Sequence, residues 1–201
     1  MTNGHTSKEA TRRSRPRPSA VVAEMGVLPS MAVTALGLGF LRPASGTWGS
    51  LPPAVVAGLL LLMHQPAWLI DLSMVLLLAI GCVACLRFGR AAERACGGKD
   101  PGQVVADEVA GQAIVLLALP WASVESWGSG SLVPPAGVSP LLFDLGLTAV
   151  AFLLFRIFDV LKPPPANGLQ KLGGGLGILV DDLIAGAMAA VLLQVVIRFL
   201  F

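Results

Sequence analysis

Long apolar runs dominate this chain, and short polar stretches separate them. Five runs stand out, and they cover residues 51–63, 67–86, 108–121, 140–160 and 183–201. They are rich in Leu, Ala and Val, and few residues that punctuate strands interrupt them. Inside a bilayer the backbone has no water to bind, and a helix pairs its own polar groups. The pattern therefore predicts an all-α fold: a polytopic membrane helix bundle of about five apolar helices.

Two of the five runs are short for a complete crossing of the membrane. A spanning helix needs about 20 residues, and residues 51–63 and 108–121 fall below that length. We expect these helices to be tilted, to be extended by their flanks, or to pack as partial spans. A weaker apolar stretch, residues 31–41, is predicted to be re-entrant or to lie in the membrane interface.

The composition supports the bilayer as the solvent of this protein. Of 201 residues, 55% are hydrophobic and only 13% are charged, and the mean hydropathy is +0.77. A soluble domain carries about a quarter charged residues. The length allows one membrane domain over residues 19–201, after a basic tail at residues 1–18 that we expect to be disordered and cytoplasmic. Basic flanks orient membrane proteins, so the tail does not indicate a nucleic-acid partner.

The basic residues also predict an orientation. If the five runs alternate across the membrane, thirteen of the fourteen Lys and Arg residues fall on one side. The opposite loop, residues 122–139, contains none. Because cytoplasmic loops carry the excess of Lys and Arg, we place the charged side and the N-terminus inside and the C-terminus outside.

Five carboxylates cluster at the ends of predicted helices on that same side: Asp107, Glu108, Asp159, Asp181 and Asp182. Ionisable groups at membrane depth are costly and usually functional. If close together they repel, and a hard divalent cation such as Mg²⁺ relieves the repulsion because it prefers carboxylate oxygens. Adjacent helical residues point about 100° apart, so one acid of a pair can bind metal while its neighbour acts through water or as a base. The alternative is that the acids only favour helix N-termini.

Arg156, Asp159 and Lys162 are spaced by three residues and so share one face of a helix. Arg156 offers a planar fork of donors suited to phosphate, and Lys162 offers a point charge. This spacing indicates an anion-binding role. The alternative is a structural ion ladder at the end of a helix.

Two glycine-rich stretches precede predicted helices. Residues 45–50 form a small, hydroxyl-bearing turn that can aim backbone N–H groups at an anion, and its candidates are Gly46, Thr47, Gly49 and Ser50. Residues 173–177 lack the preceding strand of a dinucleotide-binding motif, and we interpret them as a close-approach loop. Cys82 and Cys85 lie inside an apolar run and Cys96 follows it. Redox or zinc chemistry needs exposure and further ligands, so these cysteines are predicted to serve packing.

Four segments, in this order, resemble the phosphatidylglycerophosphatase A family: GTWGS at residues 46–50, DEVAG at 107–111, FRIFDVLKP at 155–163 and GILVDDLIAG at 177–186. The resemblance runs from about residue 36 to the C-terminus. The family usually has Pro where this chain has Ser45, which changes the stiffness of the loop but removes no charged group. The resemblance implies a lipid phosphatase of phospholipid biosynthesis, in the bacterial cytoplasmic (inner) membrane, with its active site on the cytoplasmic face.

The implied reaction is the Mg²⁺-dependent removal of the terminal phosphate of phosphatidylglycerophosphate, which gives phosphatidylglycerol. The five acids would be metal-binding and catalytic, while Arg156, Lys162 and the four residues of the 46–50 segment would bind the phosphate. The nucleophile is expected to be water activated by a carboxylate, with an aspartyl nucleophile as the alternative. A non-enzyme alternative is a small ion or proton transporter, although transporters place their sites near the midplane and these acids lie at segment ends. The oligomeric state stays open.

Overall fold

The fold is all-helical throughout the part of the chain that the structure describes. This computed structural model describes residues 16–124, 132–162, 164 and 174–200. Its elements, in chain order, are α1 (Pro18–Met25), α2 (Val27–Val33), the 3₁₀ turn η1 (Leu38–Phe40), α3 (Ser45–Leu62), α4 (Ala67–Cys96), α5 (Ala106–Leu116), α6 (Pro140–Leu161) and α8 (Gly175–Leu200). Within these residues there is no strand, so the predicted all-α class is confirmed.

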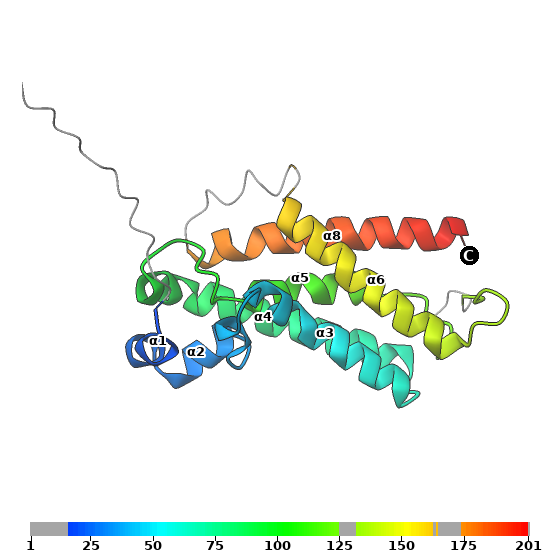
Figure 1. The fold of residues 1–201 in the computed structure, drawn as a ribbon, viewed down its shortest axis with the longest axis horizontal. Helices are drawn as coiled ribbons and strands as arrows, with labels where there is room; N and C mark the ends of the chain where they lie inside the picture. The colour runs from blue at the N-terminus through cyan, green and yellow to red at the C-terminus, as the bar shows by residue number, and fades with distance from the viewer. Residues whose placement is uncertain (1–15, 125–131, 163, 165–173, 201) are drawn as a thin grey trace, which may run out of the picture.

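Four of these helices are long and apolar enough to cross a membrane: α3, α4, α6 and α8. Figure 1 shows them running along the long axis of the molecule. Their outer faces expose large apolar side chains, such as Leu59 (53% exposed), Leu153 (58%) and Val191 (64%). A surface of this kind is a liability in water but suits contact with lipid. The predicted bundle of apolar helices is therefore confirmed, and four of the described helices are long enough to span a membrane.

The third predicted helix, α5, has only 11 residues and ends at Leu116. Ala118 adopts a positive φ of 53°, and Pro120 follows and disfavours helix at the residue before it. The bent backbone is paired by side chains: the Ala118 N–H donates to Asp71 Oδ1 (2.9 Å), and the Ala118 carbonyl accepts from Gln194 Nε2 (2.9 Å). Irregular backbone at membrane depth is tolerated only where protein or water satisfies it, so α5 packs as a partial helix inside the bundle.

Helices α3 and α8 begin earlier than predicted, and this corrects the interpretation of both glycine-rich stretches. The 45–50 segment forms the first turns of α3, and Gly175 to Gly177 form the first turn of α8. The glycines permit close packing: a Cβ on Gly49 would lie 2.5 Å from the Val105 Cβ, and one on Gly175 would overlap the Cys85 backbone. Sequence alone does not separate a packing glycine from a turn glycine, because both roles need the missing side chain.

Three further predictions concern the N-terminal tail, the apolar stretch at residues 31–41 and the cysteines. Residues 1–15 of the predicted tail lie outside the described residues, and α1 begins at Pro18, the tail's last residue. The weak apolar stretch 31–41 spans the end of α2, a turn and η1, and it leaves Leu36 83% exposed. Cys82, Cys85 and Cys96 form no disulfide within the described part of the chain, and Cys85 packs in the core beside Ala110 and Ile178, as expected for a packing residue.

Helices α5 and α8 approach each other closely enough for backbone contact. A Cβ on Gly111 would lie 2.5 Å from the Phe155 ring and 2.6 Å from the Asp182 carbonyl oxygen, and Gly186 packs on the Gly111 backbone. Both glycines belong to the motifs 107–111 and 177–186. Their close approach brings the acids of these two motifs together near the start of α3 and the end of α6 (Figure 1).

Candidate active site

Three of the predicted acids form a compact group, which we call the inner triplet: Asp107, Glu108 and Asp182. One carboxylate oxygen from each lies within 4.8 Å of the others. Asp107 is 5% exposed and Asp182 is 2% exposed. Asp107 Oδ1, Glu108 Oε2 and Asp182 Oδ2 are buried and have no hydrogen-bond partner among the described residues. Buried, unpaired carboxylate oxygens are costly, so the triplet has the properties of a site that a positively charged group completes.

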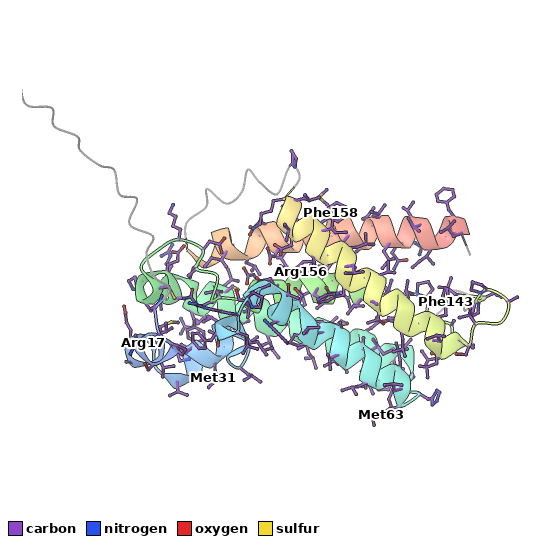
Figure 2. The ribbon with its side chains drawn as sticks, viewed as in Figure 1. Arg17, Met31, Met63, Phe143, Arg156 and Phe158 are labelled. Atoms are coloured by element: carbon purple, nitrogen blue, oxygen red, sulfur yellow. The ribbon has the colours of Figure 1, made fainter. Side chains whose placement is uncertain are left out.

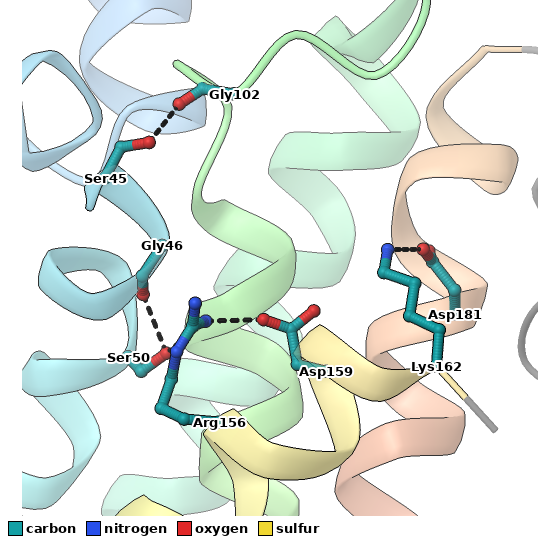
Figure 3. Close-up of polar contacts among 8 residues, drawn as sticks. All are labelled: Ser45, Gly46, Ser50, Gly102, Arg156, Asp159, Lys162 and Asp181. Atoms are coloured by element: carbon teal, nitrogen blue, oxygen red, sulfur yellow. Dashed lines mark hydrogen bonds and ion pairs between the residues drawn. The ribbon is translucent and has the colours of Figure 1, made fainter. Parts of the chain in front are cut away.

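The other two acids are paired with basic side chains. Arg156 Nη1 lies 2.5 Å from Asp159 Oδ2 and also donates to Ser50 Oγ at 3.3 Å. The Ser50 hydroxyl donates to the Gly46 carbonyl at 2.8 Å. Figure 3 shows this chain of contacts from α6 to the start of α3. Figure 2 places Arg156 where α6 crosses the bundle, far from Met63 and Phe143 toward the other end.

Lys162 pairs with Asp181 and so connects the end of α6 to α8 (Figure 3). It is the C-cap residue of α6 and has a positive φ of 41°. Burial alone would lower the pKa of the Lys162 ammonium, but its hydrogen bond to Asp181 and the charges of the neighbouring acids raise it. Lys162 thus stays a cation beside the triplet.

The start of α3 lies directly against the acids. A Cβ on Gly46 would lie 2.5 Å from Glu108 Oε1 and 3.0 Å from both terminal guanidinium nitrogens of Arg156. No side chain caps this helix, and the first N–H groups of any helix lack internal partners. Gly46 and Thr47 belong to this uncapped first turn, whereas Gly49 faces Val105. The predicted anion-binding backbone is therefore a helix N-terminus rather than a loop.

The α4–α5 loop covers this end of α3 and contains an acid that the sequence interpretation missed. Ser45 Oγ donates to the carbonyl of Gly102, which fixes the loop two residues after Asp100. Asp100 is exposed at the surface, but partial desolvation by the protein around it raises the pKa of its carboxyl; the charge of Lys162 opposes this rise, and Asp181 and Asp159 add to it. Asp100 therefore belongs to the electrostatic surroundings of the site. Its position seven residues before Asp107 was the available signal, but a loop acid is ordinarily only solvated.

The residues present fit a hard divalent cation and an anionic group. The inner triplet supplies carboxylate oxygens, the donors that Mg²⁺ prefers, and its buried oxygens have no other counter-charge bonded to them. Arg156 and Lys162 lie beside the triplet, each held by its own acid. Such an arrangement neutralises negative charge on a phosphate as well as on the acids. The fold and the site together define a helical membrane protein that can handle a phosphorylated ligand at the end of its bundle.

Comparison with known proteins agrees with this class. The family model of phosphatidylglycerophosphatase A matches residues 31–197, so the chain belongs to the phosphatidylglycerophosphatase A family. The family resemblance of the four motifs is confirmed, and the protein is a phosphoric monoester hydrolase of phospholipid metabolism. Phosphatidylglycerophosphatase A of Haemophilus influenzae is 34% identical over 157 residues, which cover 77% of this chain and 80% of that protein.

Two further relatives show the breadth of the similarity. Phosphatidylglycerophosphatase A of Escherichia coli is 30% identical over 155 residues, which cover 77% of this chain and 74% of that protein. A Bacteroides thetaiotaomicron protein, provisionally named a phosphatidylinositol-3-phosphatase, is 31% identical over 171 residues, which cover 84% and 92%. No solved structure gives a significant match to the chain.

Proposed function

We propose that this protein hydrolyses the terminal phosphomonoester of phosphatidylglycerophosphate, with Mg²⁺ as cofactor, at the cytoplasmic face of the bacterial inner membrane. The products are phosphatidylglycerol and inorganic phosphate. The observation that carries this proposal is the inner triplet, in which one buried oxygen of each acid has no hydrogen-bond partner in the part of the chain that the structure describes. It lies beside an Arg and a Lys that are each already held by an acid. The substrate's name comes from the relatives, and the chemistry comes from the site.

In this proposal the two kinds of acid have different roles. Asp107, Glu108 and Asp182 hold the cation, which when bound supplies Lewis-acid chemistry, neutralising phosphate charge and making water a stronger nucleophile. Asp159 and Asp181 hold Arg156 and Lys162 in place, so that these cations are positioned before the phosphate arrives. Water attacks phosphorus, and the bond from phosphorus to the glycerol oxygen breaks. A carboxylate of the cluster accepts the proton of the attacking water, and that proton then passes to the leaving glycerol oxygen.

Phosphate release from purified protein in lipid micelles tests the proposal. The substrates are phosphatidylglycerophosphate, phosphatidic acid and a phosphatidylinositol monophosphate, each measured with Mg²⁺, with EDTA and with EDTA followed by excess Mg²⁺. We expect the highest kcat/KM for phosphatidylglycerophosphate, loss of activity with EDTA and recovery with Mg²⁺. Full activity after exhaustive chelation would contradict the cation, and a preference for the inositol lipid would contradict the substrate while keeping the enzyme class.

Cysteine labelling from either side of the membrane tests the orientation. In a chain whose native cysteines are replaced by Ala, Gly98→Cys lies in the α4–α5 loop and Ala136→Cys lies before α6; both positions are exposed. Because Lys and Arg favour the cytoplasmic side, we expect an impermeant maleimide to label Gly98→Cys only in inverted vesicles. Ala136→Cys should react only in intact spheroplasts, and the reverse pattern would overturn the proposed cytoplasmic site.

A further inference from the structure

One polar side chain near the inner triplet has no role in the chemistry described above. Gln112 lies on α5, four residues after Glu108, and its side chain is fully buried. Neither its Nε2 nor its Oε1 has a hydrogen-bond partner among the described residues. By contrast, Gln194 on α8 uses its Nε2 to donate to the Ala118 carbonyl at 2.9 Å.

Burying an amide without a partner is expensive. Each unsatisfied buried polar group costs roughly 1–3 kcal/mol, and an apolar side chain of similar size would avoid that cost. Its place in a bundle surrounded by lipid removes bulk water as a partner. A residue kept at such a cost, one helical turn from a group of acids, indicates a partner that forms when the site is in use.

Glu108 supplies the complementary atom. Residues four apart on a helix are neighbours, with Cβ atoms about 5–6 Å apart. Within the described residues, Glu108 Oε2 is an acceptor without a partner and Gln112 Nε2 is a donor without one, so one hydrogen bond would satisfy both. The other oxygen, Glu108 Oε1, is the atom that faces Gly46. A hydrogen bond to Oε2 would therefore orient the Glu108 carboxylate while its Oε1 still faces Gly46.

We propose that Gln112 is a positioning residue of the active site, which fixes the Glu108 carboxylate by donating a hydrogen bond to its Oε2, through at most one water molecule. This inference rests on the proposed cation site and deepens it. Partners behind a metal ligand orient it, and their loss typically costs 10–100-fold in metal affinity or activity. The Gln112 Oε1 remains as a second acceptor in the same buried space.

The variant Gln112→Leu separates a functional from a structural role by its effects on Mn²⁺ binding and turnover. If Gln112 only fills space, Leu removes an unsatisfied amide, so Tm rises or stays and activity is retained. If it positions Glu108, Mn²⁺ binding measured by titration calorimetry weakens by roughly 10–100-fold, and kcat falls by a similar factor, while Tm does not fall. Gln112→Met is the second variant if Leu prevents folding.

Two controls complete the experiment. Gln194→Leu removes a hydrogen bond that is already made, so it should lower Tm while Mn²⁺ affinity and kcat stay at the wild-type values. In a Glu108→Gln background, Gln112→Leu should cause no further loss, because it acts through Glu108. Unchanged Mn²⁺ affinity and kcat in Gln112→Leu, with wild-type protein binding Mn²⁺, would overturn this inference alone. Absence of Mn²⁺ binding by the wild type would instead count against the proposed function.

Discussion

Buried acids occupy both ends of this bundle, but their surroundings differ. At the end where α6 begins, Asp144 is fully buried, and its two oxygens accept hydrogen bonds from Ala122 N–H (2.9 Å), Ser123 N–H (2.8 Å) and Ser123 Oγ (2.5 Å). At the end where α5 begins, the inner triplet brings three acids together, and one oxygen of each has no hydrogen-bond partner among the described residues. Both oxygens of Asp144 are thus satisfied by donors, whereas each acid of the inner triplet keeps an unsatisfied oxygen.

The difference shows which property of a buried acid indicates function. Burial itself does not, since Asp144 is as buried as Asp182. A carboxylate whose oxygens accept hydrogen bonds has a structural role: it pairs backbone N–H groups that would otherwise be unpaired in the membrane. An unsatisfied one carries a cost that a ligand relieves. The three predictions below test this distinction.

Asp182→Asn should produce the largest effect. It removes a charge from the inner triplet with little change in volume, so the protein should still fold. We expect kcat/KM to fall by more than about a hundredfold, because losing a residue that only orients a metal ligand already costs 10–100-fold in activity. Phosphate release and Mn²⁺ titration measure this. The double variant Asp107→Asn with Asp182→Asn should be hardly worse than the poorer single, since residues acting as one unit are not additive. Near-normal turnover in both single variants would reject the catalytic triplet.

Gly46→Ala should produce an intermediate effect. The added Cβ would lie 2.5 Å from Glu108 Oε1, which is too close, so the Glu108 carboxylate or the start of α3 must shift. A misplacement of 1 Å can cost about a hundredfold in rate, and we expect about tenfold because the end of a flexible side chain absorbs part of the shift. Gly98→Ala is the matched control, because its Cβ would meet nothing within 4 Å. Equal kcat/KM in the two variants would show that the close approach of α3 to the acids has no functional consequence.

Asp144→Asn should have the smallest effect on turnover and a clear one on stability. The new amide group replaces one acceptor oxygen and faces a donor from Ala122 or Ser123, so at least one buried hydrogen bond is lost. We expect the free energy of unfolding to fall by about 1–3 kcal/mol, while kcat per folded molecule is unchanged. Thermal unfolding in detergent and an active-site-normalised assay distinguish the two. A loss of kcat as large as that in Asp182→Asn would remove the contrast between the two ends.

Much of the fold was predictable because lipid imposes a simple rule on sequence. The apolar runs gave all four helices of spanning length, with α4 and α6 beginning at the predicted residues 67 and 140. The early ending of α5 was only partly predictable, because Pro120 is the one break in an otherwise apolar stretch. The bent backbone at Ala118 is satisfied by Asp71 and Gln194, which are distant in sequence.

The residues of the site were predictable from their type, but their pairing was not. Acids and bases at the ends of apolar runs mark a polar site, because such groups are costly in lipid. Which acid faces which base depends on how helices cross. Asp159 and Asp181 pair with Arg156 and Lys162, while the adjacent Asp182 joins Asp107 and Glu108. Asp100 and Gln112 were missed because a loop acid and a lone buried Gln have no distinctive pattern.

The sequence by itself determined the solvent of this protein, its class of fold and its set of reactive groups. Apolar runs of a given length have few stable forms in a bilayer, and charged groups among them need a reason to be there. Only the tertiary structure decided which of those groups are satisfied. That property depends on contacts between helices, such as the glycine contact of α5 with α8 and that of α3 with Glu108. Sequence order does not encode the distances between such helices, and these distances separate an acid that is satisfied by hydrogen bonds from the acids of the candidate site.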